Sequence, residues 1–133
     1  VRYLSGEVHA DVNKGRIDDA TTPLYIAAQN DHLDVVRYLA GEVNANVNQA
    51  RTSGATPFYI AAQNGNIEMV RYLAAETNAD VNQGRADNGT TPIYMATQNG
   101  NFKVVRFLAG ETNADVNMAR TDDGCTPLYI SAE

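Results

Sequence analysis

The chain has 133 residues, a hydrophobic content of 44% and a formal net charge of −6. This hydrophobic content is ordinary for a folded domain and argues against disorder, and no apolar run approaches the roughly 20 residues of a membrane-spanning helix. The acidic balance argues against nucleic-acid binding, which usually rests on a positive field. We therefore expect neither a nucleic-acid nor a membrane partner.

A string of the type Thr-Pro-Leu-Tyr-Ile-Ala occurs four times with small changes. Its copies begin at Thr22, Thr56, Thr91 and Thr126. The steps between copies are 34, 35 and 35 residues, and a fixed period of this size indicates a stack of repeats that contact only their neighbours. We divide the single domain of residues 1–133 into a partial repeat at 1–21, complete repeats at 22–55, 56–90 and 91–125, and a partial repeat at 126–133.

The repeat at 56–90 illustrates how each copy is expected to begin. Thr56 is a suitable N-cap, because its hydroxyl can accept a hydrogen bond from an otherwise unpaired helix N–H. Pro57 fits the first helical position, where its missing N–H leaves no bond unmade. Asn64-Gly65 should end this short first helix, since both residues tolerate the left-handed conformation.

A second helix is predicted over about 66–76. Ile67, Val70 and Leu73 have the spacing of one apolar stripe. Asn78 is expected to end this helix in place of the more usual glycine. The polar stretch 83–90 then predicts a projecting turn or hairpin before the next Thr-Pro.

Several linked motifs recur in order along nearly the whole chain. They are Gly-x-Thr-Pro-Leu (89–93, with Ile in the Leu place, and 124–128), Ala-Ala (27–28 and 61–62), Asn-Gly (64–65 and 99–100), Val-Val-Arg-Tyr-Leu (35–39) and Asp-Val-Asn beginning at Asp11, Asp80 and Asp115. In these motifs the chain resembles the ankyrin repeat family. The resemblance implies an all-α solenoid of antiparallel helix pairs, with hairpin-like loops projecting at a right angle.

The chain also departs from the family pattern. Its repeats are longer than the usual unit of about 33 residues. Glycines expected in the turns are replaced by Ala20 and Asp31. The family's histidine after Thr-Pro-Leu is replaced by Tyr25, Tyr59, Tyr94 and Tyr129. A buried tyrosine needs a hydrogen-bonding partner for its hydroxyl.

In the ankyrin family, partners bind the loop tips and the outward side of the first helices. By alignment, the helix positions of this surface are Gln29, Asn30, Gln63, Asn64, Gln98 and Asn99. The loop positions are Arg16, Arg51, Ser53, Arg85, Asp87, Asn88, Arg120, Asp122 and Asp123. Two interpretations of the loop arginines stay open: a strip that grips an extended acidic or polar partner, or Arg–Asp pairing between repeats that orders the loops.

Two further rows have structural interpretations. Asparagines at the base of the loops are expected to hydrogen-bond to adjacent loop backbone, and they are Asn13, Asn48, Asn82 and Asn117. Arginines on the second helices are expected to form a solvated outer face, and they are Arg2, Arg37, Arg71 and Arg106.

No catalytic, cofactor or metal site is predicted. His9, His32 and Cys125 are the only residues of their types, so neither a zinc motif nor a Cys–His or Ser–His–Asp set is credible. A single cysteine allows no internal disulfide, which fits a reducing compartment, and we expect an intracellular, cytoplasmic location.

The leading functional hypothesis is a non-catalytic scaffold for protein–protein interaction, with a partner protein of unknown identity. The alternative is a structural spacer, spring or self-stacking filament segment, because the copies are nearly uniform. Residues 1–4 align with 36–39, and Glu133 aligns with Gln98, so both ends cut through a repeat. We therefore expect a segment of a longer array that can associate end to end.

Overall fold

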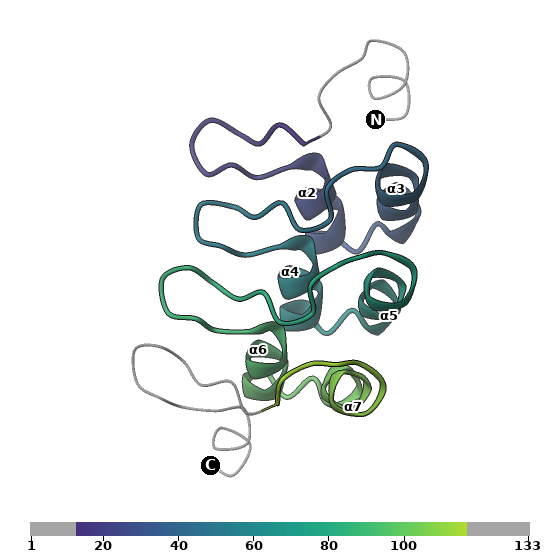
Figure 1. The fold of residues 1–133 in the computed structure, drawn as a ribbon, viewed down its shortest axis with the longest axis vertical. Coiled ribbons are helices and arrows are strands. Elements are labelled where there is room, and N and C mark those ends of the chain that lie inside the picture. The colour runs from purple at the N-terminus through teal and green to yellow at the C-terminus, as the bar shows by residue number, and fades with distance from the viewer. Residues whose placement is uncertain (1–12, 117–133) are drawn as a thin grey trace.

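The computed structural model describes residues 13–116, which form a stack of helix pairs (Figure 1). The first helix of each pair is α2 (Pro23–Gln29), α4 (Pro57–Asn64) or α6 (Pro92–Gln98). The second is α3 (Leu33–Arg37), which continues into a π-helical turn η1 (Tyr38–Glu42), then α5 (Ile67–Glu76) and α7 (Phe102–Glu111). Residues 13–116 contain no strand, and the predicted all-α solenoid is confirmed.

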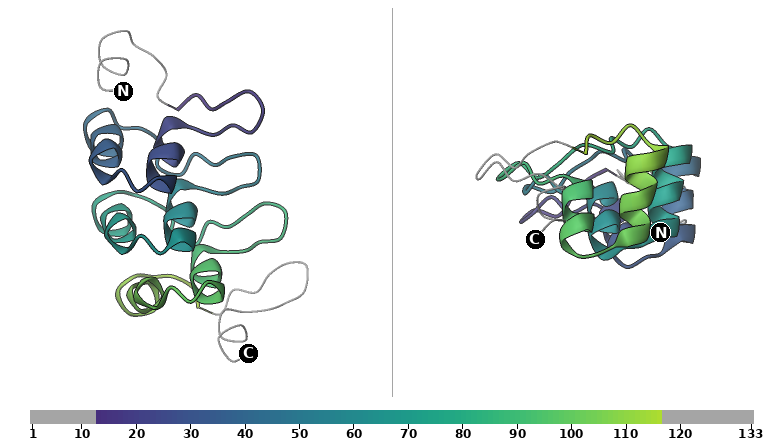
Figure 2. Two further views of the ribbon diagram at one scale, coloured as in Figure 1. Left: turned by 180° about the vertical axis from the view of Figure 1, so that it is seen from behind. Right: turned by 90° about the horizontal axis from the view of Figure 1, so that it is seen from below.

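The stack has three columns (Figure 1). The first helices α2, α4 and α6 form the central column, the second helices lie on one side of them, and the long loops project on the other. The end-on view in Figure 2 shows the two helical columns superposed from one repeat to the next. Packing runs from α2 to α4 and from α4 to α6, while each first helix also packs on its own second helix. The loops therefore emerge side by side on the face opposite the second helices.

The first helices begin as the Thr-Pro pairs predict. The side-chain oxygens of Thr22, Thr56 and Thr91 accept hydrogen bonds from the backbone N–H groups three residues later, at 3.2, 3.1 and 3.4 Å. All three threonines are buried, and a proline occupies the first turn of each helix. A buried cap satisfies a donor that water could not reach, so this position fixes where the three described first helices start.

The core is continuous from one repeat to the next because each repeat buries the same positions. Leu39, Leu73 and Leu108 of the second helices are at most 1% exposed. One position of the first helices, occupied by Leu24, Phe58 and Ile93, is at most 2% exposed. Burial of one such side chain stabilises a fold by about 1.5–3 kcal/mol. No described helix is long and apolar enough to cross a bilayer.

Two turns keep a glycine geometry without glycine. Ala20 has φ of 62° and Asp31 has φ of 59°, close to Gly89 at 69° and Gly100 at 71° in the corresponding turns of a later repeat. The described copies of each turn therefore share a left-handed residue at this position, whether or not it is a glycine. Aspartate tolerates this left-handed region better than alanine, so Ala20 is the more strained of the two.

The prediction that Asn78 ends the second helix is wrong. Helix α5 ends at Glu76, and Thr77 takes extended backbone while its hydroxyl donates to the carbonyl of Leu73. The same hydroxyl accepts a hydrogen bond from the N–H of Ala79 at 3.2 Å. One side chain therefore bonds both to the last turn of the helix and to the segment that follows it.

The complete repeat at 22–55 has Val43 at this position, and valine has no hydroxyl to form either bond. There the helix widens into the π-helical turn η1, and Asn44 takes a left-handed backbone with φ of 55°. In the described repeats a regular α-helical end thus occurs where a threonine makes these bonds, and the wider turn occurs where it is absent.

Candidate partner-binding surface

Asparagines at the base of the loops join one repeat to the next. The Oδ1 atoms of Asn13, Asn48 and Asn82 each accept a hydrogen bond at 2.7 Å from a backbone N–H in the following loop. The side-chain amide of Asn48 also donates to the carbonyl of Asn78 at 3.1 Å. The predicted role of the described asparagines is confirmed, whereas Asn117 lies outside the described residues. We call these three residues the asparagine ladder.

Backbone hydrogen bonds add a second link between consecutive loops. The N–H of Thr52 donates to the carbonyl of Asp19 at 2.9 Å, and the N–H of Ala86 donates to that of Ser53 at 2.7 Å. A Cβ atom on Gly54 would lie 2.3 Å from the backbone nitrogen of Ala86, so a side chain there would block this approach. The loops are thus fixed relative to one another and offer a partner a defined surface.

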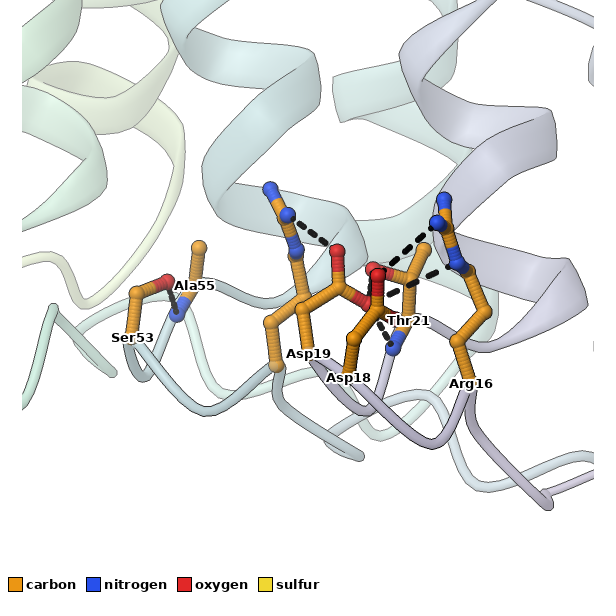
Figure 3. Close-up of polar contacts among 7 residues, drawn as sticks. Arg16, Asp18, Asp19, Thr21, Ser53 and Ala55 are labelled. Atoms are coloured by element: carbon orange, nitrogen blue, oxygen red, sulfur yellow. Dashed lines mark hydrogen bonds and ion pairs between the residues drawn. The ribbon is translucent and has the colours of Figure 1, made fainter.

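Asp19 is the centre of the first loop junction (Figure 3). Its Oδ1 accepts from the N–H of Thr21 at 3.0 Å and from its hydroxyl at 2.6 Å, and its Oδ2 pairs with Nη2 of Arg51 at 2.8 Å. Arg16 lies on the other side and pairs with Asp18 at 3.0 Å. The Thr21 hydroxyl and the Arg51 guanidinium hold the pKa of Asp19 well below its usual range.

Arg51 is built into the junction and is not free to grip a partner. Its guanidinium carbon lies 5.1 Å from the ring centre of Tyr25. Hydrogen bonding with the Tyr25 hydroxyl, and then with Asp19, raises the pKa of Arg51. Of the two interpretations of the loop arginines, pairing between repeats describes Arg51, which also lies over the ring of the buried Tyr25.

The next junction differs because Ser53 occupies the place of Asp19. No carboxylate is offered to Arg85 from the preceding loop, so its Nε bonds to Asp87 of its own loop at 3.0 Å. Burial raises the pKa of Tyr59 to about 12, and the nearby charge of Arg85 opposes this rise. Asn88 keeps the turn by accepting from the hydroxyl of Thr90 at 2.6 Å.

The candidate residues of the first helices divide into two kinds. The side-chain amides of Asn64 and Asn99 donate to the carbonyls of Gln29 and Gln63 in the preceding repeat, at 3.2 and 3.0 Å. These asparagines hold the helix ends together. Asn101, which the sequence did not single out, does the same through a 2.8 Å bond to the Gln63 carbonyl.

The glutamines of the same helices remain available. Gln29 and Gln98 are exposed and Gln63 is partly exposed, and within residues 13–116 their side-chain amides have no hydrogen-bonding partner. Asn30, at the end of α2, is exposed as well. Arg120, Asp122 and Asp123 lie outside the described residues. We call Gln29, Gln63 and Gln98 the glutamine row.

A family model for ankyrin repeats in three copies matches residues 1–85 and 78–133, which together span the chain. The chain belongs to the ankyrin repeat family. A comparison with curated proteins gave no match. Ankyrin repeats are generally modules for protein–protein interaction, the family is generally non-catalytic, and its members typically bind protein partners.

The second helices of this ankyrin stack carry a feature that the sequence interpretation missed. Of the predicted outer-face arginines, Arg37, Arg71 and Arg106 are exposed but their guanidinium groups lie over aromatic rings, whereas Arg2 lies outside the described residues. Arg37 lies 4.9 Å from the ring centre of Tyr72, and Arg71 lies 5.0 Å from that of Phe107. The aromatic residues recur one position after each arginine, and this spacing could have predicted the contact between repeats.

The absence of a bound metal stays a prediction for this ankyrin chain. Within residues 13–116, no group of three or more histidine, cysteine, aspartate or glutamate side chains is placed to hold a metal ion. The acidic residues of the loops, such as Asp19 and Asp87, are paired with arginines instead. These loop charges are therefore already paired within the described part of the chain.

Proposed function

We propose that this chain is a non-catalytic scaffold that binds an extended polar segment of a partner protein along its first helices and loops. The glutamine row is the observation that carries this proposal. It places one side-chain amide in each described repeat at the same helix end, and each amide offers both a donor and an acceptor. An extended backbone presents both kinds of group at regular intervals, so it is a suitable complement.

The spacing of the row defines the partner further. Bonds from Asn64 and Asn99 to the backbone of the preceding glutamine hold the helix ends in register. Packed helices lie about 8–10 Å apart, and an extended chain advances about 3.3 Å per residue. Successive glutamines therefore match every third residue of an extended partner. Because the loops and helix ends are already bonded to their neighbours, little ordering would oppose binding.

The proposal can be tested by selecting peptides from a phage-displayed library on the immobilised chain. Binding of the selected peptides is then measured by fluorescence titration against a variant with Gln29→Ala, Gln63→Ala and Gln98→Ala. We expect the affinity to fall at least about tenfold, because each lost amide removes hydrogen bonds of about 0.5–1.5 kcal/mol. A matched control carries Glu42→Ala, Glu68→Ala and Glu76→Ala, which are exposed residues of the second helices. Equal loss in both variants, or no loss in either, would refute the proposed surface.

The second candidate function is a structural spacer or self-stacking segment. The contacts that favour it are the asparagine ladder and the backbone bonds between loops, because the same links recur at successive junctions. Such repetition gives a stiff rod whose units could also join end to end. Light scattering over a range of concentrations tests this function, since a mass that stays constant at one chain would argue against self-stacking.

A further inference from the structure

A groove of about 620 Å³ runs between α5 and α7 on the outer side of the stack. Arg71 from α5 lies on one side of it, and Lys103, Arg106, Phe107 and Glu111 from α7 line the other. These helices lie in the column opposite the projecting loops (Figure 1), so the groove is separate from the glutamine row. Its lining is cationic, although the chain as a whole is acidic.

Two of its cations are held in place by aromatic rings. The guanidinium of Arg71 lies 5.0 Å from the ring centre of the buried Phe107, and that of Arg106 lies 5.4 Å from the ring centre of Phe102. A guanidinium that rests on a ring keeps its N–H groups directed away from the ring face. The guanidinium groups of Arg71 and Arg106 are therefore partly preorganised for an oxyanion, which each can bind with paired hydrogen bonds.

These cations have no protein anion as a partner. Within residues 13–116, Arg71, Lys103 and Arg106 form no ion pair, whereas Arg16, Arg51 and Arg85 of the loops are all paired. The groove lining has three cations against the single carboxylate of Glu111, a net charge of +2. An unneutralised charge of this size favours a compact dianion.

Among the described repeats, the cationic lining is specific to the junction between α5 and α7. Lys103 occupies the position that Asp34 has on α3 and Glu68 has on α5. The corresponding junction between α3 and α5 therefore has Arg37 and Arg71 with a carboxylate where the groove has an ammonium group. The repeat that contains α7 thus differs from the two described repeats before it in the sign of this exposed charge, and the difference makes the groove lining cationic.

We propose that this groove binds a phosphate monoester carried by a phosphorylated segment of a partner protein. A phosphate monoester has a charge of about −1.5 to −2 near neutral pH, which matches the groove. A long polyanion such as nucleic acid would meet Glu68 and Asp34 along the same column, and the net charge of −6 gives it no long-range attraction. The same charges oppose an anionic membrane.

The test uses the full chain, labelled with ¹⁵N, and titrates it with a phosphoserine tripeptide and with inorganic phosphate. We expect saturable shifts of the amides of α7 and of the side chains of Arg71 and Arg106 with both probes, and none with the unphosphorylated tripeptide. Lys103→Glu copies the residue that α5 already has, so the fold should be retained. This variant should weaken phosphopeptide binding at least about tenfold, because it replaces a cation in the groove by an anion.

Lys14→Glu is the matched control, since it makes the same change of net charge at an exposed lysine outside the groove. It should leave the affinity within about twofold. Equal weakening by both substitutions, or no weakening by Lys103→Glu, would overturn the proposal. A further experiment uses phosphatidylserine vesicles. If the chain sediments with them and Lys103→Glu abolishes this binding, the partner of the groove is a lipid surface and the proposed phosphoprotein partner is wrong. Failure of the glutamine-row experiment would leave these outcomes unchanged.

Discussion

Substitution of Asn48 by alanine should weaken the junction between two repeats without changing the core. Asn48 accepts the N–H of Asp80 at 2.7 Å and donates to the carbonyl of Asn78 at 3.1 Å. Each hydrogen bond contributes about 0.5–1.5 kcal/mol. Water can reach both partners after the substitution because Asn78 and Asp80 are exposed, so we expect a loss of about 1–2 kcal/mol in the free energy of unfolding.

The experiment is urea unfolding followed by circular dichroism, together with hydrogen exchange of the Asp80 amide measured by NMR. Asn48→Asp keeps the acceptor for the Asp80 N–H and removes the donor, so it should lose less stability than Asn48→Ala. Asn30→Ala removes an exposed asparagine from the end of a first helix and should change stability by less than about 0.5 kcal/mol. Unchanged exchange at Asp80, with Asn48→Ala as stable as the parent chain, would refute the reasoning.

Four further outcomes are expected. Ala20→Gly should stabilise the chain by about 0.5–1 kcal/mol in urea unfolding, because it relieves a φ of 62°; no gain would mean that the turn is unstrained. Val43→Thr should restore a regular helix end and stabilise it by about 1 kcal/mol, and NMR couplings that still place Asn44 at positive φ would contradict this. The folded-state pKa of Asp19 is lowered, so its contribution to stability is present above the ordinary carboxyl pKa of about 4 and is lost as the pH falls below it. Asp19→Asn should reduce the fall in the free energy of unfolding as the pH decreases below this value. The pKa of Tyr59 is raised to about 12, so its contribution is present below the ordinary phenol pKa of about 10 and is lost as the pH rises. In an ultraviolet titration, Tyr59→Phe should remove a late-titrating phenol.

The start of each repeat could be predicted from the sequence because it depends on adjacent residues. A threonine followed by a proline suits an N-cap and the first helical position whatever lies further away. The role of the asparagine ladder was predictable for a related reason. A short amide at the base of a loop has few possible partners besides loop backbone.

The rest depended on how the repeats stack. Asn64 and Asn99 were assigned to the partner-binding surface, but they bond to backbone carbonyls 35 and 36 residues earlier in the chain. Arg51 likewise meets Tyr25 and Asp19 across a repeat boundary. Local pattern could not reveal these contacts, because only the register of neighbouring repeats decides them.

The asparagine ladder has a consequence for how such a chain can change. Its side chains bond to main-chain atoms of the following unit, and every amino acid except proline supplies the N–H that they need. After a repeat is inserted or removed, the asparagines at the new junction can form the same bonds to the backbone of the following repeat. No matching substitution is required in the neighbouring repeats. These links make the repeats interchangeable, and sequence differences such as that at Lys103 can then arise in one unit without disturbing the others.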